Sequence, residues 1–189
     1  MLAAARDVFL AHGYAAATVN DVIAVSRGSR ATLYAEFGDK EGLFAAIIED
    51  LCAGIVTALP ITPGAEDPET VLAALGRAYM KVLMAPANLA LYRMVIAEAA
   101  RSPALGHKVY LAGPAAAAES LADYLAREVK RGRLAIKDVQ LAARHFLELI
   151  KGDLHTRALF GGRRAGRREI DASIQGGVRI FLHGSTRTA

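Results

Sequence analysis

Residues 29–36 read Ser-Arg-Ala-Thr-Leu-Tyr-Ala-Glu, an octapeptide with one large aliphatic side chain, Leu33, among small, hydroxylated and charged ones. Ser29 is a good helix N-cap, so the segment predicts a short helix that buries little more than Leu33. The preceding tripeptide, Ser26-Arg27-Gly28, has the composition of a turn. A short helix with one apolar anchor and an otherwise exposed surface has the dimensions of the second helix of a helix-turn-helix.

The neighbouring segments complete this pattern within the first 60 residues. A first helix is expected to end at Gly13, because glycine is favoured in the left-handed position after a helix. Thr18 and Asp21 have the spacing of a capping box and open a second short helix. Asp39 is expected to cap a longer helix that reaches about residue 59. The N-terminal part of the chain therefore predicts three short helices followed by a longer one.

Composition favours helix throughout the 189 residues. Hydrophobic residues make up 53% of the chain, but 39 positions are alanine and only 12 are phenylalanine or tyrosine. Alanine favours helices, whereas strands select β-branched and aromatic residues. The single cysteine, Cys52, excludes an intramolecular disulfide and suggests a reducing compartment. No membrane-spanning apolar run and no signal-peptide pattern is evident, so we expect a cytoplasmic protein.

The remaining sequence predicts longer helices after a segment rich in proline and glycine, residues 60–68. We expect an all-α fold of about nine helices in two domains: residues 1–45, with helix 39–59 connecting, and residues 60–189. The helices expected after the linker cover about residues 68–85, 88–100, 103–131, 136–160 and 167–183. The pair Gly113-Pro114 predicts a kink or break in the third of these.

Charge alone does not mark the N-terminal part as a nucleic-acid-binding surface. The whole chain carries a net charge of +4, yet residues 1–60 hold four cations and seven anions, a net −3. The case for nucleic acid therefore depends on which side chains the short helix over residues 29–36 presents. Arg30 can donate two hydrogen bonds to guanine, and Thr32 offers a hydroxyl and a methyl group. The expected base-facing residues are Ser29, Arg30, Ala31 and Thr32, and the expected phosphate contacts are Thr18, Asn20, Tyr34 and Lys40.

Five short segments resemble the tetracycline-repressor (TetR) family of bacterial transcription regulators. They are Ala4-Ala5-Arg6-Asp7-Val8-Phe9, His12-Gly13-Tyr14, Thr18-Val19-Asn20-Asp21-Val22-Ile23, Ser29-Arg30-Ala31-Thr32-Leu33-Tyr34 and Phe37-Gly38-Asp39-Lys40-Glu41-Gly42-Leu43-Phe44. The resemblance covers residues 2–50 and departs from the common pattern at Ser26-Arg27-Gly28, where Ala-Gly-Val is usual. It implies a homodimeric regulator, usually a repressor and not an enzyme, that binds palindromic operator DNA. A small molecule bound in the C-terminal domain would release it.

The C-terminal region gives weaker signals. Bulky or polar-tipped side chains of the middle helices could line a cavity for a small, largely apolar effector: Tyr79, Leu83, Tyr92, Met94, Tyr110, Tyr124, His145 and Phe146. Apolar stripes on the last two helices predict a dimer interface that includes Leu141, Leu149, Ile170, Ile174, Val178 and Phe181. No metal-ligand spacing or cofactor motif occurs, so no metal or cofactor is expected.

Two other functions remain compatible with the sequence. The chain could be a helical ligand-binding or enzymatic bundle with a vestigial helix-turn-helix, which the −3 charge of residues 1–60 would favour. It could also use its N-terminal unit to hold another protein. A gel shift with the native promoter region would test the first alternative, and an affinity that does not change with salt would favour the second over DNA binding.

Overall fold

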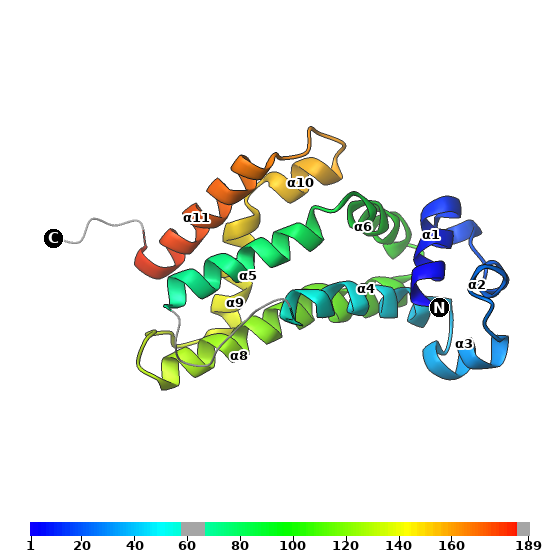
Figure 1. Cartoon of the computed structure of the whole chain (residues 1–189), viewed down its shortest axis with the longest axis horizontal. Coiled ribbons are helices and arrows are strands. Elements are labelled where there is room, and N and C mark those ends of the chain that lie inside the picture. The colour runs from blue at the N-terminus through cyan, green and yellow to red at the C-terminus, as the bar shows by residue number, and fades with distance from the viewer. Residues whose placement is uncertain (58–66, 185–189) are drawn as a thin grey trace. The chain divides into compact units, whose positions relative to one another are not determined.

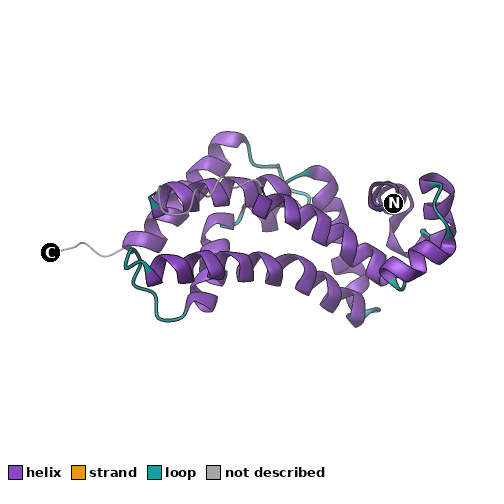
Figure 2. Ribbon diagram, turned by 60° about the horizontal axis from the view of Figure 1, so that its bottom comes forward, coloured by secondary structure: helices purple, strands orange, loops and turns teal. Residues whose placement is uncertain are grey.

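The computed structural model describes residues 1–57 and 67–184, with the side chains of residues 52–57 outside the description. In these two ranges every regular element is a helix (Figure 2). The expectation of an all-α fold is therefore confirmed. The chain divides into two compact units: Met1–Gly54 with Ala85–Ala116, and Ile55–Met84 with Ala117–Ala189.

The first unit contains the N-terminal helices together with two helices that follow residue 85. Its elements are α1 (Leu2–Ala16), α2 (Val19–Ser26), α3 (Arg30–Phe37), α4 (Lys40–Thr57), α6 (Pro86–Ala99), α7 (Pro103–Tyr110) and the π-helical turn η1 (Leu111–Ala115). α6 packs against both α1 and α7. The shared core joins Leu33 of α3 to Leu43 and Phe44 of α4 and to Leu91 and Leu105 of α6 and α7. All five side chains are fully buried, so this core holds α3 in place from behind.

An aromatic cluster fixes the end of α1 against the start of α4. Phe9, Tyr14 and Phe44 lie with their ring centroids 5.0–5.6 Å apart. Tyr14 reaches this position because Gly13 has φ 75° and ψ 165°, which takes the backbone out of the helical region for one residue. Helical hydrogen bonding then resumes to Ala16. The first helical segment therefore ends at Gly13 with the expected positive φ, and a further short helical segment follows it to Ala16.

The second unit contains helices of which two pack against the last helix that the structure describes. Its elements are α5 (Pro68–Leu83), α8 (Ala116–Lys130), α9 (Val139–Lys151), α10 (Leu154–Leu159) and α11 (Arg167–His183). α11 packs against α9 and α5, as Figure 1 shows. Two glycines allow this close packing. A Cβ added at Gly76 would lie 3.0 Å from Ile174, and one added at Gly177 would lie 3.0 Å from the backbone nitrogen of Ile150.

Proline and glycine explain where three helices after residue 83 begin, end or are interrupted. The predicted break before the helix expected over residues 88–100 is present, but α6 begins two residues earlier, at Pro86, since proline suits the first turn of a helix. The α-helix is interrupted at Gly113 and Pro114, where a kink or break was predicted, by a π-helical turn between α7 and α8. The helix expected over residues 136–160 is two helices, because Gly152 adopts φ 50° after α9.

Several predictions fall wholly or partly outside the described residues. The linker prediction falls mainly on residues 60–66, and the domain limits 1–45 and 60–189 stay a prediction. The side chain of Cys52 also lies outside the description. Among the described residues, no single helix is long and apolar enough to cross a membrane. Only α5 and α6 taken together, as a bent pair, reach the required length and hydropathy.

Candidate nucleic-acid interface

The N-terminus of α2 is held by a complete capping box. The Thr18 hydroxyl accepts a hydrogen bond from the Asp21 backbone nitrogen at 3.2 Å, and Asp21 Oδ2 accepts one from the Thr18 backbone nitrogen at 2.8 Å. The Thr18 hydroxyl also donates to the same carboxylate oxygen at 2.7 Å. These hydrogen bonds hold the pKa of the Asp21 carboxyl below its usual value. The predicted capping box is therefore confirmed, and the Asp21 carboxylate is occupied by hydrogen bonds within the first turn of α2.

The turn between α2 and α3 has an unusual backbone conformation. Arg27 adopts φ 54° and ψ 23°, the left-handed region that glycine and asparagine prefer. The Gly28 backbone nitrogen donates to the Ser26 hydroxyl at 3.3 Å. A Cβ on Gly28 would lie 2.4 Å from the terminal methyl group of Met1. The tripeptide therefore makes the expected turn, with the left-handed conformation at arginine and the close approach at glycine.

The α3 helix buries one side and exposes the other. The Ser29 hydroxyl accepts from the Thr32 backbone nitrogen at 3.0 Å, which confirms the predicted N-cap. The Ser29 and Thr32 hydroxyls are also hydrogen-bonded to each other at 2.7 Å. Leu33 is fully buried, whereas Tyr34 is 49% exposed. Ser29, Arg30, Ala31 and Thr32 are exposed as well, so the four predicted base-facing residues share one accessible turn.

One contact links the two helices across the turn. The Arg30 guanidinium donates through Nη2 to the side-chain oxygen of Asn20, in the first turn of α2. Both side chains are exposed. The sequence did not predict this pairing, because the partners lie ten residues apart on different helices.

Lys40 is held at the start of α4 by Tyr14 and the end of α1. Its ammonium group lies 4.5 Å from the centroid of the Tyr14 ring and donates to the Ala15 carbonyl at 3.3 Å. Partial burial lowers the pKa of Lys40. Burial, with nearby Glu41 and Asp39, raises the pKa of the Tyr14 hydroxyl to about 12. Lys40 is therefore a positioned cation beside the helix-turn-helix.

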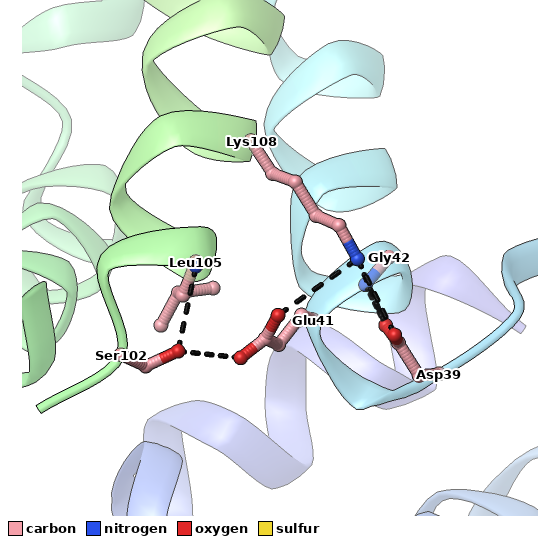
Figure 3. A network of polar contacts seen from close by, with 6 residues as sticks. All are labelled: Asp39, Glu41, Gly42, Ser102, Leu105 and Lys108. Carbon is pink, nitrogen blue, oxygen red and sulfur yellow. Dashed lines mark hydrogen bonds and ion pairs between the residues drawn. The ribbon is translucent and has the colours of Figure 1, made fainter.

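A polar cluster that the sequence analysis missed joins the start of α4 to α7 (Figure 3). Asp39 Oδ1 accepts from the Gly42 backbone nitrogen at 2.6 Å, which makes Asp39 the N-cap that the sequence predicts. The Lys108 ammonium lies 3.2 Å from the Asp39 carboxylate and 3.8 Å from that of Glu41. Ser102, whose hydroxyl accepts from the Leu105 backbone nitrogen, donates to Glu41. No local pattern could indicate these contacts, because the partners lie 61 to 69 residues apart.

Comparison with known proteins agrees with this geometry along both parts of the chain. Residues 1–47 match the family described as bacterial regulatory proteins, tetR family. Residues 70–184 match the C-terminal domain of AefR-like transcriptional repressors, a TetR-type domain. The chain belongs to the TetR family. It is a transcriptional regulator with a helix-turn-helix DNA-binding domain, and the prediction that it is not an enzyme is confirmed.

Solved structures of TetR proteins align over almost the full length of the chain. A protein from Mesorhizobium loti MAFF303099 is 28% identical, with a TM-score of 0.82 over 96% of this chain and 92% of that one. The flavonoid-responsive regulator FrrA is 29% identical, with a TM-score of 0.76 over 96% and 92%. A TetR transcriptional regulator from Agrobacterium tumefaciens is 26% identical, with a TM-score of 0.75 over 96% and 90%. Among curated proteins, none matches the sequence.

The side chains predicted to line an effector cavity are divided between the two units of this TetR chain. In the second unit Tyr79, Tyr124 and Phe146 are buried, Leu83 is half-buried and His145 is exposed. In the first unit Tyr92 and Met94 are half-buried and Tyr110 is exposed. Met94 packs on the core behind α3. The Tyr124 hydroxyl is buried with no hydrogen-bond partner among the described residues, and burial raises its pKa to about 12.

The side chains predicted to form the dimer interface have unequal exposure. Ile174 and Val178 are fully buried inside their own chain, where α11 meets α5 and α9. Phe181 is half-buried against Phe146, with ring centroids 5.1 Å apart. Leu149 and Ile170 are also half-buried, and Leu141 is 41% exposed. Leu141 and the half-buried residues are therefore the ones that a second copy could reach.

Proposed function

We propose that this regulator is a repressor that binds a palindromic operator as a homodimer and leaves it when a small, largely apolar effector binds. The observation that carries the proposal is the exposed turn of α3, where Arg30 and its neighbours stand clear of a helix anchored by Leu33. The match to the C-terminal domain of AefR-like repressors supports the direction of regulation. Its place of action is the cytoplasm, where bacterial DNA is found.

In this proposal α3 enters the major groove of DNA. Ser29, Arg30, Ala31 and Thr32 face the bases, and Arg30 forms paired hydrogen bonds with a guanine. The phosphate contacts come from residues around this turn, namely Thr18, Asn20, Tyr34 and Lys40. The DNA-binding domain covers residues 1–45, helix 39–59 connects it, and residues 60–189 form the ligand-binding and dimerisation domain.

Dimerisation is proposed through α9 and α11. The exposed or half-buried apolar side chains on these helices include Leu141, Leu149, Ile170, Phe181 and Ile180, the last 44% exposed. Fully buried Ile174 and Val178 support this surface from behind. A twofold axis would present two copies of α3 to successive major grooves about 34 Å apart, which is why the operator would be palindromic.

The effector is proposed to bind among the buried aromatic residues of the C-terminal domain. Tyr79, Tyr124 and Phe146 provide apolar surface there, and the Tyr124 hydroxyl is a buried polar group that a ligand could pair with. FrrA, which aligns over 96% of this chain, is described as flavonoid-responsive. That description favours a small aromatic effector for this chain as well. Such a ligand releases the operator if it binds the DNA-free conformation more tightly.

Selection from a pool of random duplexes, followed by affinity measurements on the enriched sequence, tests the proposal. We expect a palindromic site whose preference at one position per half-site is lost in Arg30→Ala. Lys40→Met keeps the length of the side chain but not its charge. It should weaken binding to all duplexes alike and reduce the salt slope by about 0.9 per subunit. If no duplex is enriched, or if Arg30→Ala keeps the full preference, the proposal is wrong.

A further inference from the structure

The hydrogen bond between Arg30 and Asn20 has a chemical property that matters for recognition. An arginine that reads guanine must keep its positive charge and also point in one direction. Asn20 is a neutral acceptor, so it can fix the direction of the Arg30 guanidinium without cancelling its charge. The guanidinium has five N–H donors, so a single contact leaves a pair of them for the O6 and N7 atoms of guanine.

The nearest acidic residue in α2 does not compete for Arg30. Asp21 follows Asn20 directly, but its Oδ2 accepts hydrogen bonds from both the backbone nitrogen and the hydroxyl of Thr18. A carboxylate committed to its own helix cap is a poor partner for a cation elsewhere. The local sequence therefore places one free amide oxygen and one occupied carboxylate next to each other, and Arg30 contacts the amide.

Asn20 and Arg30 both lie on backbone that is fixed by the capped starts of their helices. Asn20 lies between Thr18 and Asp21, inside the capping box of α2. Arg30 is the first residue of α3, directly after the Ser29 N-cap. Because the two helix starts are held, the hydrogen bond restricts mainly the long arginine side chain. Ordering that side chain before DNA binding lowers the entropic cost of recognition.

We propose that Asn20 is a specificity-determining residue that positions Arg30 for base recognition. This inference rests on the proposed function, because it assumes that Arg30 reads a base in the operator. It also differs from a simple phosphate contact by Asn20, which would strengthen binding to every duplex equally. The amide NH2 group of Asn20 can still donate to a phosphate, so the two roles are separated by measurement.

The test uses the full-length chain and two duplexes, the selected operator and a copy changed at the position that Arg30→Ala makes indifferent. Asn20→Ala is measured in the wild-type and Arg30→Ala backgrounds. We expect it to lower the affinity ratio between the two duplexes by about 2- to 10-fold, which is the effect of freeing one ordered side chain. In the Arg30→Ala background, Asn20→Ala should change that ratio by less than about 1.5-fold, since the coupling requires both partners.

Asn20→Asp is a second variant of nearly the same shape. Its carboxylate would form an ion pair with Arg30, so affinity for both duplexes should fall and the salt slope should decrease by about 0.9 per subunit. Both positions are exposed, and equal melting temperatures of the variants would show that the fold is intact.

The outcomes separate this inference from the proposed function. If Asn20→Ala weakens both duplexes equally, or acts the same with and without Arg30, Asn20 does not position Arg30 and the inference is overturned. The proposed function would then still stand, provided that Arg30→Ala loses its base preference. If the wild-type chain enriches no duplex, both are overturned.

Discussion

The cap at the start of α4 gives a prediction whose size follows from the structure. Asp39 has two roles there: its Oδ1 accepts from the Gly42 backbone nitrogen at 2.6 Å, and its carboxylate pairs with Lys108 at 3.2 Å. Asp39→Ala removes both interactions. Asp39→Asn keeps a good N-cap acceptor and removes only the charge. Comparing the two variants therefore separates the cap from the ion pair.

Replacing an N-cap by alanine costs about 1 kcal/mol. The charge of Asp39 faces a half-exposed lysine and the start of a helix, and these two attractions together are worth about 0.5–1 kcal/mol. We therefore expect Asp39→Ala to lower the free energy of unfolding by about 1.5–2 kcal/mol and Asp39→Asn by about 0.5–1 kcal/mol. For a chain of 189 residues, these values correspond to falls in Tm of about 5 °C and about 2 °C.

Calorimetry or circular dichroism at one protein concentration measures these shifts. The pH dependence provides a control with a definite sign. Hydrogen bonding to Gly42, aided by Lys108, lowers the pKa of Asp39, so its charge stabilises the fold above its usual pKa and the benefit is lost in acid. The gap in Tm between wild type and Asp39→Asn should therefore narrow as the pH falls below about 3.9, the usual pKa of an aspartate. If Asp39→Asn were as unstable as Asp39→Ala, the proposed split of the stabilisation between the helix cap and the charge would be wrong. A Tm difference between wild type and Asp39→Asn that persists in acid would also refute it.

Three further changes test other parts of the structure by thermal or urea unfolding. Gly42→Ala should destabilise the chain by about 2 kcal/mol or more, because the new Cβ would lie 2.0 Å from the carbonyl oxygen of Phe37; unchanged stability would contradict the described turn. Gly177→Ala should destabilise the second unit, where its Cβ would lie 3.0 Å from the α9 backbone. Its neighbour Gly176→Ala, with nothing within 4 Å, should be neutral or stabilising by up to about 1 kcal/mol. Burial lowers the pKa of His155 to about 4, so the unfolded chain binds more protons and stability should fall by up to about 3 kcal/mol between pH 7 and pH 4. His155→Gln should flatten this profile, and an equally steep profile in that variant would assign the effect to other groups.

The sequence predicts those features of the fold that depend on neighbouring residues. The caps at Thr18, Ser29 and Asp39 and the burial of Leu33 follow from spacing alone, and the structure confirms each of them. The spacing of apolar residues does not predict whether a glycine ends a helix or is accommodated within it. A continuous helix was therefore expected across Gly152, where the structure has two helices.

Contacts between distant segments could not be predicted from the sequence, for a different reason. The pairing of Lys108 with Asp39 connects α7 to α4, and no periodicity within either helix encodes it. The Arg30 and Asn20 contact is closer in the chain, but it depends on the angle that the turn gives to α3. The effector residues are hardest to predict, because a buried aromatic such as Phe146 has the same pattern whether it fills the core or lines a cavity.

The left-handed Arg27 has a consequence for how this regulator could acquire new operators. A non-glycine residue in that conformation costs about 1 kcal/mol, which Arg27→Gly would restore without altering any side chain of α3. Substitutions of the residues that contact DNA often reduce stability. A chain in which Arg27→Gly can restore part of that stability therefore tolerates more substitutions in α3. Laboratory evolution of altered specificity would therefore start from a more robust background if position 27 were mutated first.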